Sequence, residues 1–354
     1  MKRTKKVHRF GDGLAYLRTI GIILVLLSHM GESFASALPL GVCVLLVAAG
    51  HAMAQKAVSE INKGTFSVVR FYRSQLLPYI FPTLVVMLST VGLVTIFEKR
   101  RMIHIALEFV MDMLGAGNFL LIFDTHSHFL VTLGNSPLMH MGYVAIFMQF
   151  SLAWPLVCLA YAKVKEGLGT GDGIILMAIF TLWSFTFPTM HMIFRPDTSE
   201  IALRFNTAIQ MHALFCGAFM GILDAEGVSP LAIMDAPTAN MVSVLYIPLL
   251  GCIMALYKNR SFAYMIVACM ATAFMVGVLS SDKEKKTVIP DNPLTFFINS
   301  IVCEMILLHH PICYFLDKAH PVHDAWYAAV SLALIIALSI YLRKLTEITR
   351  ILLK

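Results

Sequence analysis

Charged residues are scarce in this chain. Asp, Glu, Lys and Arg make up 14% of its 354 residues, whereas they make up about 25% of an ordinary soluble domain. Hydrophobic residues make up 58%, and they gather in runs of roughly 17 to 25 residues, the length of a transmembrane helix. The shortage of charge therefore excludes a soluble globular protein and indicates a chain that crosses a membrane many times.

Cysteine motifs and sequence repeats are also lacking. The seven cysteines lie in apolar segments and form no Cys-x-x-Cys pair, which favours free cysteines that pack in the interior over a disulfide framework or a zinc site. The glycine-rich GTGDG at 169–173 has no P-loop lysine, so it is read as a turn. No internal repeat, heptad pattern or low-complexity segment is visible. We therefore predict one membrane domain over residues 1–354, without a metal site.

The apolar runs predict an all-α transmembrane bundle of about ten spans. The basic start MKRTKKVHRF precedes a run without a small-residue cleavage pattern, so the first span is predicted to stay uncleaved. The expected spans lie near 12–30, 38–56, 74–97, 138–162, 172–190, 205–224, 239–257, 262–280, 294–316 and 325–343.

The segment 102–123 is ambiguous, because it is apolar but interrupted by His104, Glu108, Asp112 and a Gly-Ala-Gly turn. If this segment does not cross, eighteen Lys and Arg flank the inner side and eight the outer side; if it crosses, the split becomes fourteen to twelve. The positive-inside rule favours the first arrangement. We therefore expect both termini in the cytoplasm and 102–123 to be re-entrant or to lie at the outer interface. The same rule accounts for the net charge of +6 without a nucleic-acid partner.

The first span carries two ionisable groups, Arg18 and His29, eleven residues apart. In a helix this spacing makes roughly three turns, so both side chains share one face and lie roughly 16 Å apart along the axis. Ionisable groups at such depth are costly unless they face a protein interior or a wet cavity. One stripe of this span is therefore predicted to line a polar pathway.

A pair of cations, Arg70 and Arg73, precedes the third span in VVRFYRSQLLPYIFP. The i, i+3 spacing places both guanidiniums on one helix face, where they suit the fork geometry of phosphate recognition. Ordinary positive-inside anchoring also explains the pair, and on this pair alone it is the favoured explanation.

A third group lies within the ninth span, where SIVCEMILLHHPICYF contains Glu304, His309 and His310. Such groups normally face a cavity, although a histidine can also bind a neighbouring helix as structural glue. Because the predicted topology places His309 and His29 in the same outer half of the membrane, a functional role is favoured.

These motifs resemble the acyltransferase-3 family of integral-membrane O-acyltransferases, which modify bacterial surface carbohydrates. The family's R-x10-H pattern matches Arg18 and His29, its RxxR matches Arg70 and Arg73, and its YLxHxP signature is similar to LLHHPI, with His309 on the family histidine. Weaker similarities lie in 41–53, 150–156, 212–223 and the tail YLRKLTEITR. The chain departs from the family in its middle segment, where the usual Trp and Glu fall near Gly142 and Phe147.

The resemblance implies a membrane O-acyltransferase of the bacterial inner membrane. It would move an acyl group from a cytoplasmic acyl-CoA to a hydroxyl of an envelope carbohydrate. The expected acyl group is acetyl, and the expected donor is acetyl-CoA. His29 is expected to act as general base beside Arg18, and Arg70 and Arg73 would bind the phosphates of the donor. His309 and Glu304 would orient His29 or the acceptor. Direct transfer and a covalent relay both remain open, as does the oligomeric state, a homo-oligomer included.

Two other classes fit the residues. A transporter or flippase for a saccharide or small solute would also use buried His, Arg and Glu, although the two-half repeat of many transporters is not visible. A non-catalytic family member in a polysaccharide assembly complex would account for the altered middle segment. Acetyl-CoA-dependent modification of a glycan separates the enzyme from both alternatives.

Overall fold

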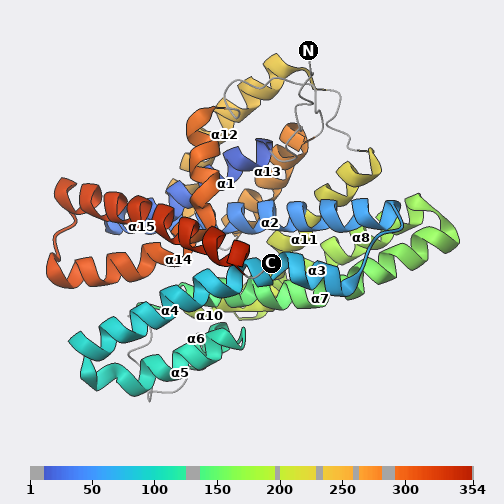
Figure 1. The fold of residues 1–354 in the computed structure, drawn as a ribbon. Helices are drawn as coiled ribbons and strands as arrows, with labels where there is room; N and C mark the ends of the chain where they lie inside the picture. Colours follow the sequence, from blue (N-terminus) through green and yellow to red (C-terminus); the bar gives the residue numbers. More distant parts are fainter. Residues whose placement is uncertain are drawn as a thin grey trace, which may run out of the picture.

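The computed structural model describes residues 12–124, 136–195, 200–228, 234–257, 263–280 and 292–352. Throughout this part of the chain the regular elements are helices (Figure 1). They are α1 (Asp12–Leu27), η1 (Glu32–Phe34), α2 (Ala37–Asn62), α3 (Val68–Gln75), α4 (Leu77–Phe97), η2 (Lys99–Arg101), α5 (Met102–Met113), α6 (Gly117–Asp124), α7 (Met141–Leu168), α8 (Thr170–Ser184), α9 (Thr186–Phe194), α10 (Glu200–Phe205), α11 (Thr207–Glu226), α12 (Ala236–Tyr257), α13 (Ala263–Ser280), α14 (Pro293–Ala319) and α15 (Ala325–Leu352).

The predicted all-α membrane bundle is confirmed in its coarse form. Eight helical segments of the described chain are long and apolar enough to cross a bilayer: Ala37–Asn62, Val68–Phe97, Met141–Leu168, Thr170–Phe194, Thr207–Glu226, Ala236–Leu256, Pro293–Ala319 and Ala325–Thr349. Two further predicted spans coincide with shorter apolar helices, Leu14–Leu27 in α1 and Ala263–Leu279 in α13.

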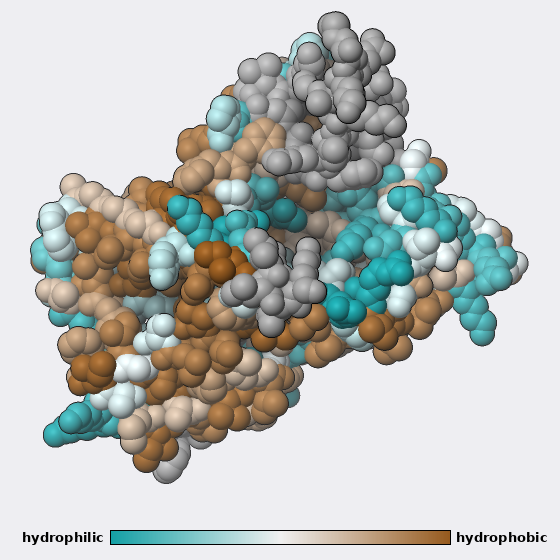
Figure 2. Space-filling view, in the orientation of Figure 1, coloured by the Kyte–Doolittle hydropathy of each residue, from teal (hydrophilic) through white to brown (hydrophobic). Residues whose placement is uncertain are grey.

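The outer surface of the bundle is largely apolar, as expected for helices in contact with lipid. Hydrophobic residues cover much of the face drawn in Figure 2, whereas hydrophilic residues gather at the end formed by α2, α7 and α8. Large side chains on the spans, such as Ile96, Leu156 and Leu182, are 67%, 70% and 69% exposed. An apolar surface of this extent marks contact with a membrane or a partner, and the span lengths point to the membrane.

The segment 102–123 does not form one helix of spanning length. It folds into the short helices α5 and α6, separated at Leu114–Ala116, where Gly115 adopts a left-handed φ of 69°. The Gly115 carbonyl accepts a hydrogen bond from Gln149 Nε2 at 2.7 Å, which fixes the turn against α7. Neither helix approaches the roughly 20 residues that a perpendicular crossing needs.

The centre of the bundle is the close pairing of α2 with α11. A Cβ built at Gly50 would lie 2.1 Å from the Leu214 carbonyl oxygen, and one at Gly217 would lie 1.9 Å from that of Val47. Small residues at these contacts allow the two backbones to approach, which is how helices associate in a bilayer. The interface also buries His51 and Asp224, whose side chains are 1% and 3% exposed and meet at 2.6 Å.

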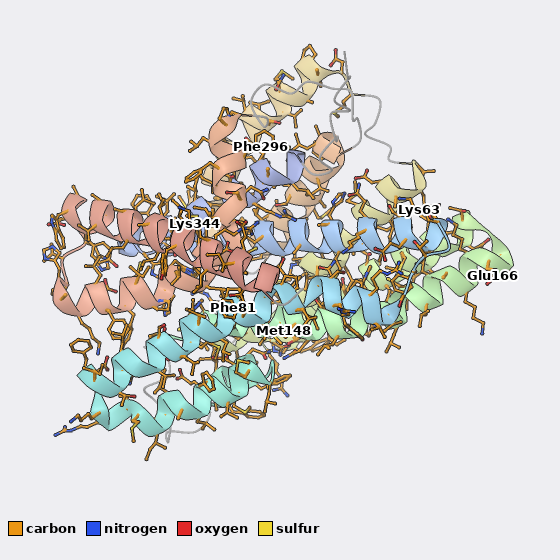
Figure 3. The ribbon with its side chains drawn as sticks, viewed as in Figure 1. Lys63, Phe81, Met148, Glu166, Phe296 and Lys344 are labelled. Atoms are coloured by element: carbon orange, nitrogen blue, oxygen red, sulfur yellow. The ribbon has the colours of Figure 1, made fainter. Side chains whose placement is uncertain are left out.

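Polar groups join three helix ends at one end of the bundle. Lys165 Nζ of α7 donates to Asn62 Oδ1 of α2 and to the Glu226 carboxylate of α11, each at 2.7 Å. Lys63, which follows α2, and Glu166, in the last turns of α7, lie toward this same end in Figure 3. The last turns of α2, α7 and α11 therefore point in one direction.

Helix α14 runs parallel to α1. Arg18 near the start of α1 donates to Asn299 Oδ1 near the start of α14 at 3.4 Å, and His29 after α1 lies beside His309 further along α14. Helix α1 ends at Leu27, so His29 lies in the following turn rather than on the helix that the spacing predicted.

Candidate active site

A cavity of about 560 Å³ lies among α1, α2, α4, α7 and α14. Along α2 its wall extends from Leu38 to Lys56, a stripe that also includes Val42, Leu45, Ala49 and Met53. From Leu38 to Lys56 the helix rises roughly 27 Å, close to the roughly 30 Å thickness of a hydrocarbon core. The cavity therefore follows the bundle for most of the depth of a bilayer.

Four histidines meet at one end of this cavity. The ring centroid of His29 lies 5.4 Å from those of both His309 and His310. His140, in the turn before α7, lies 5.3 Å from His309 and 5.4 Å from His310. All four line the cavity. We call this group the histidine cluster.

Pro311 explains the place of His140. A proline has no backbone N–H, so the carbonyl four residues earlier in the helix loses its donor, and in α14 that carbonyl belongs to Leu307. His140 Nε2 donates to this carbonyl oxygen at 3.0 Å. A backbone oxygen that would otherwise lack a partner in an apolar surrounding is thereby satisfied.

Two more rings of the cluster are held by backbone carbonyls. His310 Nε2 donates to the Ser136 carbonyl at 2.9 Å, and His309 Nδ1 donates to that of Ile306 at 2.8 Å. A carbonyl only accepts, so Nδ1 of His309 carries the proton and its Nε2 is left as an acceptor in the neutral ring.

The ring of His29 differs from the others. It forms no hydrogen bond with any residue in the described part of the chain, and it is only half-buried. Both of its nitrogens are therefore available to a molecule in the cavity. Of the four imidazoles, His29 is the one best placed to exchange a proton with a substrate.

Arg18 lines the same cavity closer to the start of α1 and α14. Its bond to Asn299 is long, at 3.4 Å, so the guanidinium keeps most of its donors for other groups. The structure thus places both residues of the R-x10-H pattern in one cavity, at separate levels.

Cations also gather at the end of the cavity remote from the histidine cluster. Lys56 of α2 and Gln75 of α3 line this end, and Lys56 Nζ donates to Ser74 Oγ at 2.8 Å. Arg70 and Arg73 lie exposed on the same helix, outside the cavity wall. The Arg70 guanidinium donates to the Thr65 carbonyl at 3.0 Å.

Helix α3 is short for local reasons. Ser67 caps its start by accepting a hydrogen bond from the backbone of Arg70. After a break at Leu76, α4 begins at Leu77 with Pro78 in its first turn. The break separates α3, which carries Arg70 and Arg73, from α4, and the end of α3 lines the cavity at Gln75.

Glu304 does not line the cavity. Its carboxylate is buried on another side of α14 and lies 3.7 Å from Arg343 of α15. Five residues at 100° each place Glu304 roughly 140° around the helix from His309, which explains why the two separate. A direct catalytic part for Glu304 stays a prediction, and its contact supports the packing of α14 on α15.

The end of α14 beyond the histidine cluster is fastened to α4 and η2. Lys318 Nζ and Tyr314 Oη donate to the Glu98 carboxylate at 2.7 and 3.0 Å. Burial alone would raise the pKa of Glu98, but the hydrogen bonds from Lys318 and Tyr314 outweigh it and lower that pKa below its ordinary value. Glu98 is therefore ionised at neutral pH and keeps this contact closed.

His140, Lys56 and Asp112 are ionisable residues of the cavity that the sequence analysis did not predict as site residues. His140 begins a predicted span at the same outer end as His29, which was the available signal for it. Asp112 lies in the ambiguous segment 102–123. Among the described residues, no group of three or more His, Cys, Asp or Glu has the arrangement of a metal site, the histidine cluster included.

One curated protein with detectable similarity is the peptidoglycan O-acetyltransferase OatA of Listeria monocytogenes serovar 1/2a. The two sequences are 21% identical over 225 residues, which make up 63% of this chain and 36% of the relative. The chain thus spans about a third of that relative's length. No family model matches the sequence, and no solved structure matches it.

Proposed function

We propose that this chain is a membrane O-acyltransferase that transfers an acetyl group from cytoplasmic acetyl-CoA to a hydroxyl of an envelope carbohydrate. One observation carries the proposal: a cavity of nearly bilayer depth has cations at one end and an unengaged imidazole, His29, at the other. The distant similarity to a peptidoglycan O-acetyltransferase supports the same class of reaction. The bacterial cytoplasmic membrane is the location that the donor and the acceptor require.

The donor would bind from the Lys56 end. Arg70 and Arg73 on α3, with Lys56 at the mouth, offer three cations to its phosphates. The pantetheine arm would lie along the α2 wall past Arg18, and the thioester would reach the histidine cluster. A long and narrow molecule suits a cavity whose α2 wall alone is about 27 Å long.

The chemistry at the histidine cluster is a single displacement in this proposal. His29 takes the proton of the acceptor hydroxyl, the oxygen bonds to the thioester carbonyl carbon, and the C–S bond breaks to release the CoA thiolate. An imidazole serves as base near neutral pH without large tuning. His309, whose ring lies 5.4 Å from that of His29, would orient it or the acceptor.

The contacts at the helix ends support the predicted topology. Asn62, Lys165 and Glu226 meet at one end, and the prediction places all three on the cytoplasmic side. Glu98 and Lys318 meet elsewhere, and the prediction places both outside. The parallel course of α1 and α14 supports the same arrangement, because with the other predicted spans in place an added crossing at 102–123 would make the two helices antiparallel. Ten spans with cytoplasmic termini are the arrangement we propose.

The test is transfer of label from radioactive acetyl-CoA to envelope glycan in membranes of cells that lack or express this chain. We expect label in the glycan only when the chain is present. If no acyl-CoA labels any glycan, the enzyme proposal is wrong, and uptake of labelled saccharide into vesicles would then test transport.

A further inference from the structure

Asp112 of α5 is the one carboxylic acid among the described residues that line the cavity. Its side chain lies at the cavity wall, yet the residue is only 6% exposed. No hydrogen bond to its carboxyl group comes from the described part of the chain. Because Asp112 lines the cavity, its carboxyl group can form hydrogen bonds with a molecule bound there.

The absence of a side chain at Gly117 leaves space for this carboxyl group. A Cβ built at Gly117, the first residue of α6, would lie 1.6 Å from Asp112 Oδ1. A side chain at 117 and the present position of the carboxyl group therefore exclude each other. The turn at Gly115 brings α6 back along this side of α5.

Asp112 lies toward the histidine cluster. One turn earlier on α5, Glu108 accepts a hydrogen bond from Ser136 Oγ, and the carbonyl of Ser136 accepts the hydrogen bond of His310. Met139 and His140, which follow Ser136, line the cavity together with Asp112. The carboxyl group thus lies nearer the histidine cluster than the end of the cavity where Lys56 lies.

The surroundings restrict what this group can bind. Burial, and after it the neighbouring Glu108, raise the pKa of Asp112 well above its ordinary range. This shift favours the protonated carboxyl group, which can both donate and accept a hydrogen bond. Arg18 and Lys56 line the same cavity and disfavour a cationic ligand. A neutral molecule with several hydroxyl groups satisfies both conditions, because each hydroxyl also donates and accepts.

We propose that Asp112, with the space left by Gly117, forms the acceptor subsite and binds a hydroxyl of the sugar ring next to the one that His29 deprotonates. This inference rests on the proposed function and adds to it the group that recognises the carbohydrate. Asp112 acts here in binding and orientation, and the proton transfer stays with His29.

The variants separate the carboxyl group from its surroundings. Asp112→Leu removes both hydrogen-bonding atoms, whereas Asp112→Asn keeps one donor and one acceptor in nearly the same shape. Gly117→Ala leaves Asp112 in place but displaces its carboxyl group. Asp172→Leu makes the same replacement at an exposed aspartate in the first turn of α8 and serves as the control.

The assay uses the full chain in lipid nanodiscs, radioactive acetyl-CoA, and envelope glycan isolated from cells that lack the chain. We expect Asp112→Leu and Gly117→Ala to raise the KM for glycan about tenfold, the loss of one well-placed hydrogen bond. The KM for acetyl-CoA should stay unchanged, and Asp112→Asn and Asp172→Leu should remain near the wild type. Elution as a single species and an unchanged melting temperature exclude misfolding.

Three outcomes would overturn the inference. An unchanged KM for glycan in Asp112→Leu shows that the group does not bind the acceptor, while the proposed function stands. A raised KM for acetyl-CoA alone assigns Asp112 to the donor instead. Absence of transfer by the wild-type chain overturns the proposed function itself, and the acceptor subsite with it.

Discussion

The four histidines of the cluster differ in how their ring nitrogens are hydrogen-bonded. His140 and His310 each spend a nitrogen on a backbone carbonyl, as does His309, whereas the His29 ring is unengaged in the described chain. The bonds of His140 and His310 join α14 to the turn before α7, and that of His309 lies within α14. The ring that is free faces the space where a substrate would bind.

The first prediction concerns His29. We expect His29→Ala to lower the rate of glycan acetylation by about a hundredfold or more, because general base catalysis contributes about 10²–10⁴. Insertion and thermal stability should not change, since the ring forms no hydrogen bond in the described structure. The measurement is labelled transfer with purified protein. The control is His191→Ala on α9, outside the cavity, and wild-type rates in His29→Ala would contradict the base assignment.

A second prediction tests the pairing of His140 with the carbonyl of Leu307. His140→Ala should lower the melting temperature and the activity, because the carbonyl loses its donor; such bonds in membrane proteins contribute about 0.6–2 kcal/mol. Pro311→Ala restores a backbone N–H to that carbonyl. The effect of His140→Ala should therefore be smaller in the Pro311→Ala background, and strict additivity of the two melting shifts would disprove the pairing.

At the scale of elements, two contacts decide where the cavity walls stand. Helices α2 and α11 are held at backbone distance by glycines, and α14 is fastened to α4 by the group around Glu98. The first contact sets the α2 wall, and the second sets the part of α14 that carries His309 and His310. Each can be loosened without touching a cavity residue.

The α2–α11 contact predicts opposite results for two glycines. Gly217→Ala should lower the melting temperature strongly, because the new methyl group would lie 1.9 Å from the Val47 carbonyl and the helices must separate. Gly92→Ala, in the interior of α4 with no atom within 4 Å of the added Cβ, should leave stability unchanged or raise it slightly. Equal melting temperatures for the two variants would show that close backbone approach does not stabilise the bundle.

Glu98 predicts a pH dependence of stability. Its folded-state pKa is lowered, so its contribution to the free energy of unfolding is complete above the ordinary glutamate pKa of about 4.3 and is lost as the pH falls through the lowered value. Wild type should therefore lose stability over this acid range more steeply than Glu98→Gln. Glu347→Gln, at a side chain that is 55% exposed, is the control. Identical pH profiles for Glu98→Gln and wild type would show that protonation of Glu98 does not affect the free energy of unfolding.

At the scale of the whole molecule, the cavity predicts sidedness. Acetyl-CoA should support transfer only when it is added at the face where Arg70, Arg73 and Lys56 lie. Adding it outside vesicles that hold the protein in one orientation or the other tests each face separately. Arg70→Ala with Arg73→Ala should raise the KM for acetyl-CoA about tenfold with little change in kcat, because two phosphate contacts are lost. Lys63→Ala removes a cation at the same end of the bundle and should have no effect. An unchanged KM in the double variant would disprove the phosphate clamp.

Hydropathy and charge in the sequence were sufficient to predict the positions of the spans and part of the site. Span positions follow from apolar runs, and the common level of His29 and His309 follows from the charge bias of the loops. The remaining site residues depend on contacts between distant segments. His140 matters only because Pro311, 171 residues later, frees a carbonyl, and Asp112 matters only because the turn at Gly115 returns the chain beside it. Glu304 is close to His309 in sequence but lies on another side of α14.

The histidine cluster also has a consequence for biosynthesis. Its rings come from the turn after α1, the turn before α7 and the middle of α14. These three segments are synthesised at different times, and all of them must be inserted before the histidine cluster can form. A nascent chain that has not yet delivered α14 lacks His309, His310 and the Leu307 carbonyl to which His140 donates. Until α14 is in place, the bundle therefore lacks two of the four imidazoles on which the proposed reaction depends.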